Sequence, residues 1–238
     1  MRALLAGALT ATLAVASPAS AATEVGANGN AFTGGLSFTP AEVTVAIGDT
    51  VNWRNTDSFV PHTSTEDHGL WDLSGDYGAT PANPPGYAPG AVVGRVFEAG
   101  THRYFCEVHP DDMRGTVAVP VTLVKQTQRV RRRRPAGRRR QTQRVRRRRP
   151  AGRRRFKRVT FVVATWASAT PGEGLVFDVE RRVGPHTAWR PLRTGTREVS
   201  ARFRAGIRGT PWQVRARLRR GDSQDAATDW SPAASITS

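Results

Sequence analysis

The sequence predicts an all-β protein in which a disordered linker joins two β-sandwiches. Apolar and polar residues alternate over several short stretches, as in half-buried strands, and no stretch shows a convincing helical period. A 15-residue string, QTQRVRRRRPAGRRR, occurs twice in succession at 126–140 and 141–155. The chain has 238 residues, which is room for two domains of ordinary size.

Residues 1–22 have the features of a secretory signal peptide. Arg2 supplies a positive charge, the stretch from Leu4 to Ala16 is almost entirely apolar, and Ala19-Ser20-Ala21 is a small-residue cleavage site. We therefore expect cleavage near Ala21-Ala22 and a secreted protein, either periplasmic or extracellular. The apolar run is too short to span a bilayer, and no other stretch is long enough, so we expect no transmembrane segment in the mature chain.

Residues 23–124 form the first predicted domain. Val43, Val45 and Ile47 alternate with smaller or polar residues, and the alternation resumes at Val51 and Trp53 after a Gly-Asp turn. Further strands are expected over residues 92–97, 101–106 and 115–124, with a long Gly- and Pro-rich loop over 68–89. This pattern favours a β-sandwich.

Residues 125–155 form the predicted linker. The repeats at 126–140 and 141–155 hold 16 arginines and no acidic residue, whereas the whole chain has a net charge of +17. Such a segment cannot bury enough apolar surface to offset its chain entropy, and its like charges repel one another. Outside the repeats the charges separate: residues 23–124 carry 12 acidic and 4 basic residues, and residues 156–238 carry 7 acidic and 14 basic ones.

Residues 156–238 form the second predicted sandwich, with clear alternation from Trp212 to Arg219. This region resembles a fibronectin type III module. The resemblance is carried by Trp166, FDVERR at 177–182, Trp189, WQVRARLRR at 212–220 and DWSP at 229–232. Trp212 departs from the pattern, because such modules usually carry Tyr there. The resemblance implies a spacer or adhesion module without a catalytic site.

The segment YFCEVHPDDMRGTVAV, residues 104–119, places Cys106, His109 and Met113 on one loop between two strands. Cys106 is the only cysteine, so it cannot form a disulfide within the chain. His62, which follows the Trp53 strand, supplies a second imidazole. Two His, one Cys and a weak Met form a blue-copper ligand set, whereas zinc sites seldom use Met. We therefore predict one type 1 copper ion, bound by His62, Cys106, His109 and Met113.

Residues 36–124 resemble a cupredoxin of the plastocyanin, pseudoazurin and halocyanin type. The matching residues are Phe38, Pro40, Val43, Val45, Gly48, Val51, Trp53, Asn55, His62-Thr63, Phe97, Gly100, Tyr104, Cys106, His109, Met113 and Gly115-Thr116-Val117. The resemblance implies a Greek-key β-sandwich, one type 1 copper and electron transfer, with the same four ligands. It also implies an electron exit through His109 beside Pro61 and Pro110. Asp111 and Asp112 should make this surface more polar and favour a basic redox partner.

Four functions are compatible with parts of this sequence. An electron carrier is favoured over an extracellular copper buffer or delivery protein, because the ligand set includes an axial Met. Copper nitrite reductases and oxidases also use this fold, but they need additional copper sites built largely from His. The chain has five His, so we expect no enzyme. The arginine repeats could bind an anionic envelope polymer; secretion and the lack of interleaved aromatic residues argue against a specific nucleic-acid partner.

Overall fold

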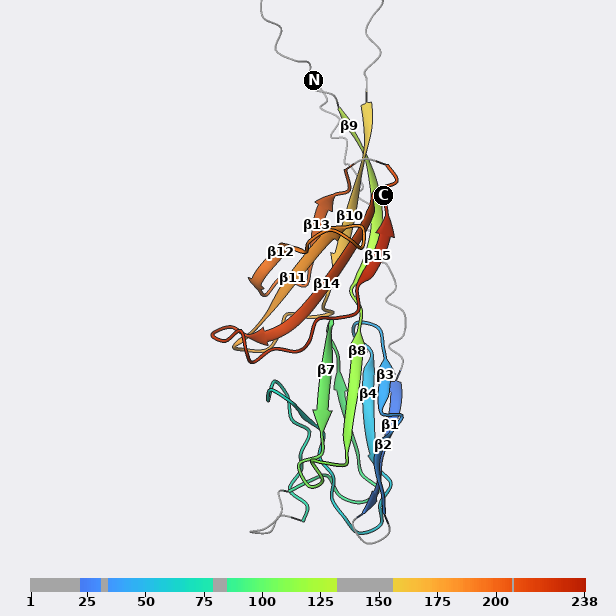
Figure 1. Cartoon of the computed structure of the whole chain (residues 1–238), viewed down its shortest axis with the longest axis vertical. Coiled ribbons are helices and arrows are strands. Elements are labelled where there is room, and N and C mark those ends of the chain that lie inside the picture. The colour runs from blue at the N-terminus through green and yellow to red at the C-terminus, as the bar shows by residue number, and fades with distance from the viewer. Residues whose placement is uncertain (1–21, 31–33, 79–84, 132–155, 207) are drawn as a thin grey trace, which may run out of the picture.

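The computed structural model describes residues 22–30, 34–78, 85–131, 156–206 and 208–238. All regular secondary structure in these ranges is β-strand, and the strands form two sandwiches stacked along the long axis of the molecule (Figure 1). The predicted all-β class is confirmed. The described ranges contain no helix long and apolar enough to cross a membrane. The predicted signal peptide lies outside them, except for Ala22.

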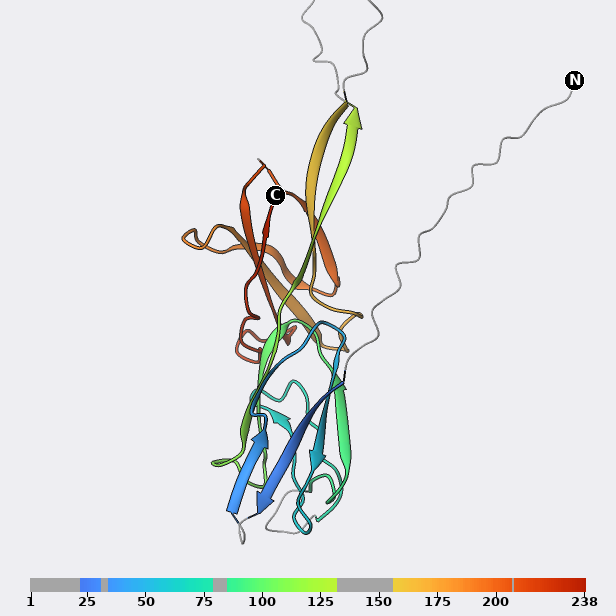
Figure 2. The same ribbon diagram turned by 90° about the vertical axis from the view of Figure 1, so that its right-hand side faces the viewer.

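The first sandwich consists of two four-stranded sheets (Figure 2). One sheet has the order β2 (Gly34–Thr39), β1 (Ala22–Asn30), β4 (Thr50–Asn55), β6 (Val92–Val96). The other has the order β3 (Glu42–Thr44), β8 (Arg114–Val119), β7 (Gly100–Phe105), β5 (Thr65–Glu66). The pairs β1–β4 and β3–β8 are parallel, and the remaining pairs are antiparallel. Strands β1 and β2 are not predicted from alternation, because glycine and alanine interrupt their apolar pattern.

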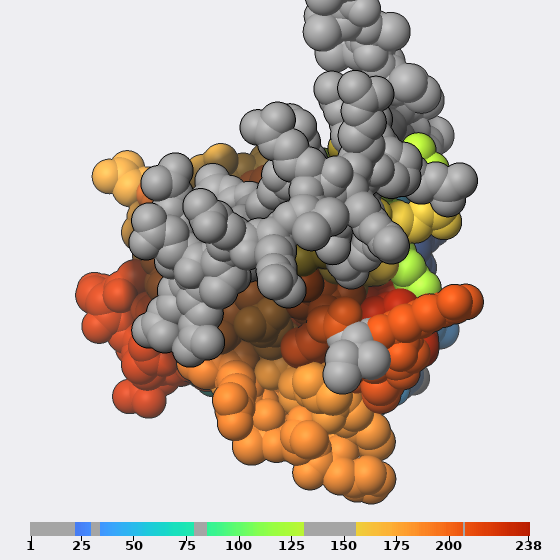
Figure 3. All heavy atoms as spheres, turned by 90° about the horizontal axis from the view of Figure 1, so that it is seen from above, coloured from blue at the N-terminus to red at the C-terminus, as the bar shows by residue number. Residues whose placement is uncertain are grey.

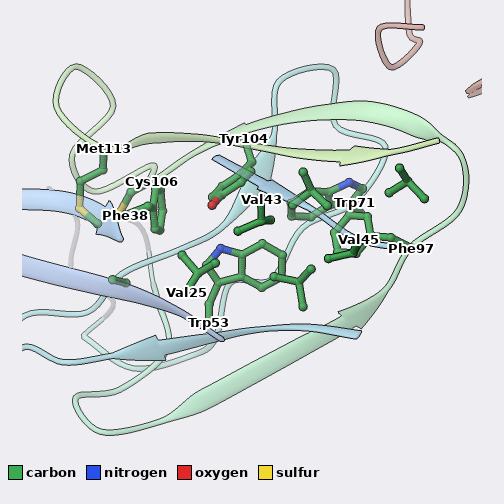
Figure 4. Close-up of a cluster of buried hydrophobic side chains, with 14 of the residues drawn as sticks. Val25, Phe38, Val43, Val45, Trp53, Trp71, Phe97, Tyr104, Cys106 and Met113 are labelled. Atoms are coloured by element: carbon green, nitrogen blue, oxygen red, sulfur yellow. The ribbon is translucent and has the colours of Figure 1, made fainter. Parts of the chain in front are cut away.

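An aromatic cluster fills the first sandwich, where Trp53 packs edge-on against Tyr104 with ring centroids 5.3 Å apart. Trp71 and Phe97 contact each other and Trp53, and all four rings are buried. In Figure 4, the sulfur atoms of Cys106 and Met113 lie together at one end of this cluster. The core therefore holds the strand that leads to Cys106 in a fixed position.

The second sandwich consists of a three-stranded and a four-stranded sheet. The first has the order β13 (Ser200–Arg204), β10 (Phe156–Thr165), β9 (Thr122–Arg131). The second has the order β12 (Arg190–Thr196), β11 (Leu175–Val183), β14 (Pro211–Arg220), β15 (Ala234–Thr237). Trp166, Phe177 and Leu218 are buried between the sheets. As the sequence alternation predicts, Val214 and Ala216 of β14 point into the same core.

Strand β9 differs from two sequence-based expectations. The strand expected over residues 115–124 is divided near Pro120, which has no backbone N–H to donate, so β8 and β9 belong to different sandwiches. Residues 125–131, expected as the start of the linker, continue β9 and pair antiparallel with β10 from Phe156 onward. The first strand of the second sandwich therefore begins before the arginine-rich repeats and includes residues 126–131 of the first repeat. The rest of the expected linker, residues 132–155, lies outside the described residues.

The two sandwiches contact each other directly. Ala99 N donates to Trp166 O at 2.8 Å, and the backbones of Thr101 and Asp229 exchange two hydrogen bonds of 3.0 and 3.1 Å. Val121, just after β8, is buried in the core of the second sandwich. Figure 3 looks down the long axis onto the second sandwich, which hides most of the first. The start of β7 is therefore attached to the second sandwich, and its end points away from it.

Candidate metal centre

The loop between β7 and β8 carries three of the predicted ligands. Cys106 follows the last residue of β7, about 20 Å from the interdomain contact at the start of that strand. The loop is closed by three backbone hydrogen bonds: His109 N to Cys106 O at 3.1 Å, Met113 N to His109 O at 3.1 Å, and Cys106 N to Met113 O at 3.0 Å. These hydrogen bonds hold the loop in one conformation, so the side chains of Cys106, His109 and Met113 keep fixed positions relative to one another.

His62 joins these residues from the segment after β4. Cys106 Sγ lies 3.7 Å from His62 Nδ1 and 3.8 Å from His109 Nδ1. The ligand atoms of all three residues lie within 4.8 Å of one another. The structure thus brings together His62 and His109, which are 47 positions apart in the sequence, around one thiol.

Met113 completes the predicted set. Its side chain is fully buried, as is that of Cys106. Both residues belong to the same apolar cluster, and their sulfur atoms point to the same end of it (Figure 4). A thioether at this position adds a soft, uncharged donor beside the thiol and the two imidazoles.

The spacing of the donor atoms fits a bound metal ion. Nitrogen and sulfur ligands lie about 2.0 and 2.3 Å from a first-row ion, and a near-trigonal arrangement separates them by about 3.7 Å. The observed S–N distances of 3.7 and 3.8 Å agree with this separation. Two imidazoles, one thiolate and one thioether form the ligand set of type 1 copper. His62, Cys106, His109 and Met113 therefore form a site suited to one copper ion.

Burial controls the protonation of the ligands. It lowers the pKa of His62 to about 4, with the neighbouring His109 as a smaller cause, and it also lowers the pKa of His109. Both imidazoles are therefore neutral at pH 7, as metal binding requires. Burial raises the pKa of the Cys106 thiol. The thiol of the metal-free chain is therefore protonated at neutral pH, and metal binding must displace this proton.

Two polar residues with no predicted role, Thr63 and Asn55, support the ligands. Thr63 N donates to Cys106 Sγ at 3.3 Å, and Thr63 Oγ1 accepts from Glu107 N at 2.8 Å. Asn55 is buried and its Nδ2 donates to Val60 O at 2.9 Å and to Tyr87 O at 3.1 Å. Both residues appear among the cupredoxin matches, and this was the available signal. Their hydrogen bonds tie the His62 segment to the rest of the site.

His109 is the ligand that lies nearest to the surface. It is half-buried, whereas His62, Cys106 and Met113 are fully buried. Pro110, Asp111 and Asp112 are exposed beside it, and Phe59 on the segment before His62 is 81% exposed. Pro61, the third residue of the expected exit surface, is half-buried next to His62. The exposed residues that lie next to the two histidine ligands in the sequence are thus apolar or acidic.

The first sandwich is similar to known copper proteins. Residues 24–120 match the model of the copper-binding proteins of the plastocyanin/azurin family. A plastocyanin from Scenedesmus fuscus is 37% identical over 91 residues, which is 37% of this chain and 92% of that protein. A purple cupredoxin from Nitrosopumilus maritimus is 27% identical, with a TM-score of 0.31, covering 41% of this chain and 98% of the other. A reduced amicyanin variant is 28% identical, with a TM-score of 0.29, covering 41% and 81%.

Proposed function

Because the chain belongs, through residues 24–120, to the plastocyanin/azurin family of copper-binding proteins, we propose that it transfers single electrons through one type 1 copper ion. The observation that carries this proposal is the convergence of His62, Cys106 and His109, with Met113 buried beside them. One ligand alone is half-exposed. This is the arrangement required of a centre that must exclude water yet exchange electrons at the surface.

The bound copper supplies a one-electron couple, and the chain supplies its rigidity. Cys106 is held by Thr63 N–H and by the closed loop, so its sulfur has little freedom to move. His62 is buried and anchored through the segment that Asn55 binds. Ligands that stay in place when the charge of the ion changes keep the reorganisation small, which favours rapid transfer. The half-exposed His109 provides the exit, beside Pro110 and Pro61.

The partner we propose is a redox protein with a basic surface. The first sandwich has 12 acidic and 4 basic residues over 23–124, and Asp111 and Asp112 are exposed next to His109. A basic partner would be drawn to this end and oriented with its own redox centre close to His109. Salt should slow such a reaction.

The remaining parts of the chain support a secreted, modular protein. We propose that residues 1–22 direct secretion to the periplasm or extracellular space, and that the second sandwich is a fibronectin type III-like spacer. Its three-plus-four strand arrangement and its contact with Ala99 and Thr101 support a spacer, because they leave the copper-binding end pointing away from it. In this proposal, residues 132–155 connect β9 to β10 within the second sandwich.

Electron exchange with a soluble cytochrome tests the proposed function. The copper-loaded mature chain is mixed with a reduced basic cytochrome, and the oxidation state of both proteins is followed over time. We expect fast, complete exchange that slows as ionic strength rises. A copper buffer or delivery protein would instead hold copper without exchanging electrons, or would release it to a chelating acceptor faster than it is reduced. Either result would contradict electron transfer and favour a copper buffer or delivery protein.

A further inference from the structure

A basic groove lies on the second sandwich, away from the copper site. Its cavity of about 510 Å³ is lined by the paired strands β9 and β10, by the end of β13 and the residues that follow it, and by Ser238. The lining residues are Lys125, Thr127, Arg158, Val159, Thr160, Arg204, Gly206, Arg208 and Ser238. Four of these nine residues have a cationic side chain and none has an acidic side chain. A cavity of this size is comparable to ordinary ligand sites.

The four cationic side chains are available to a ligand. Lys125, Arg158, Arg204 and Arg208 are all exposed. None of them forms an ion pair with another residue of the described ranges, whereas Arg193, Arg215, Arg217 and Arg219 of the same sandwich each pair with a carboxylate. Four like charges around one hollow repel one another, and a bound anion relieves this repulsion.

The groove also lies in the basic half of a strongly polarised molecule. Residues 156–238 carry 14 basic and 7 acidic residues, and β9 adds Lys125, Arg129 and Arg131. The first sandwich carries the opposite charge. This separation draws an extended anion to the second sandwich and keeps it away from the copper-binding end.

The chemistry of the lining indicates the ligand. A guanidinium group binds the oxygen atoms of a phosphate through two parallel hydrogen bonds, and three of the four cations are arginine. No aromatic side chain lines the groove, so it offers no surface on which nucleic-acid bases could stack. We propose that this groove binds a linear polymer of phosphate groups and thereby attaches the protein by the end opposite to its copper site.

Two matched double variants of the full chain test the proposal. Arg204→Gln/Arg208→Gln removes two charges from the groove. Arg190→Gln/Arg197→Gln removes two exposed charges from the same sandwich outside it. The arginines of residues 132–155 are unchanged in both variants, so they contribute equally. Tryptophan-detected unfolding confirms that both variants are folded.

Binding of inorganic polyphosphate and of poly(glycerol phosphate) is measured over a range of salt concentrations. The groove variant should bind polyphosphate about tenfold more weakly than the native chain. The slope of log affinity against log salt concentration should be smaller by about two, because two cationic contacts are removed. The control variant should keep its affinity within about twofold. The two probes separate free polyphosphate from an envelope phosphodiester polymer: the one that loses more affinity in the groove variant identifies the source.

Equal weakening in the two variants would overturn the proposal, because net charge alone would then explain binding. Unchanged binding in the groove variant would overturn it as well. Single-stranded DNA is the third probe. If the native chain binds DNA more tightly than polyphosphate, and the groove variant loses as much affinity for DNA as for polyphosphate, the groove is a nucleic-acid site and the proposal is wrong.

Discussion

At the scale of single residues, His102 links burial to pH-dependent stability. It is fully buried on β7, where it accepts a hydrogen bond from Trp71 Nε1 at 3.4 Å and lies 3.1 Å from Glu98 O. Burial lowers the pKa of His102 from 6.5 to about 4. Between these two values the unfolded chain binds a proton that the folded chain does not. Acidification through this window therefore destabilises the fold.

We predict that the free energy of unfolding of the copper-free protein falls by about 2 kcal/mol from pH 8 to pH 5 because of His102 alone. His102→Gln removes the titrating group, so the variant should lose less stability than the native chain over the same range. Denaturant unfolding at several pH values measures this difference in slope. Parallel pH profiles for the two proteins would show that His102 does not titrate as the structure requires.

Asn55 is predicted to support the copper site without touching the metal. Asn55→Ala removes the hydrogen bonds to Val60 O and Tyr87 O, which loosens the segment that positions His62. Copper affinity should fall about 10- to 100-fold, as is typical when a supporting hydrogen bond is lost. Competition with a chelator of known affinity measures the change. Asn52→Ala, on the same strand, is the control; an equal loss there would remove Asn55 from its assigned role.

The site could be predicted from the sequence at the level of ligand identity. The spacing of Cys106, His109 and Met113 places them on one loop, and the chemistry of the set then requires a second imidazole. The supporting contacts could not be predicted in the same way. The hydrogen bond to Cys106 comes from the backbone N–H of Thr63, which any residue other than proline provides, so local sequence reasoning alone does not reveal this contact. Only the folded chain shows that this donor faces Cys106.

At the scale of elements, strand β9 is where sequence and structure differ. Its alternation is weak and its charge is high, so residues 125–131 were expected to be disordered. Ten residue pairs with β10 provide the order that local composition does not. Pairing between distant strands is a tertiary effect, and a reading of local charge cannot detect it. The clearer alternation of β4 and β14 made those strands predictable.

A proline substitution tests the assignment of β9. Gln126 pairs with Phe161 of β10, so Gln126→Pro should disrupt the ladder and destabilise the second sandwich by about 1–3 kcal/mol. Gln141 occupies the same position in the second repeat, and Gln141→Pro is therefore a control with the same sequence on its C-terminal side. Thermal unfolding measures both. Equal melting temperatures would mean that residues 125–131 do not form part of the sheet.

At the scale of the whole molecule, the charge distribution separates two ends. The copper-binding sandwich is acidic and the second sandwich is basic, and direct contacts such as Ala99 to Trp166 join them. This polarity was already visible in the sequence. The position of the copper site at the far end of the acidic sandwich was not visible in the sequence. It depends on the direction of β7, whose start contacts the second sandwich and whose end leads to Cys106.

The polarity predicts how the copper-binding end meets a basic redox partner. Asp111→Asn/Asp112→Asn should lower the association rate about tenfold at low salt, and high salt should abolish the difference. Asp222→Asn/Asp225→Asn makes the same change in net charge on the second sandwich and should have little effect. Stopped-flow kinetics with a basic cytochrome measures both variants. Equal slowing would mean that total charge, not its location, governs the encounter.

Copper binding by the four ligands is the claim on which electron transfer depends, and optical titration with Cu(II) tests it most directly. The mature chain should bind one equivalent of copper and develop an intense blue band that arises from charge transfer between Cys106 and the metal. The Cys106→Ala variant should lack this band even when copper is added, while its second sandwich stays folded. The absence of a band in the native chain, or its persistence in Cys106→Ala, would contradict a type 1 copper site.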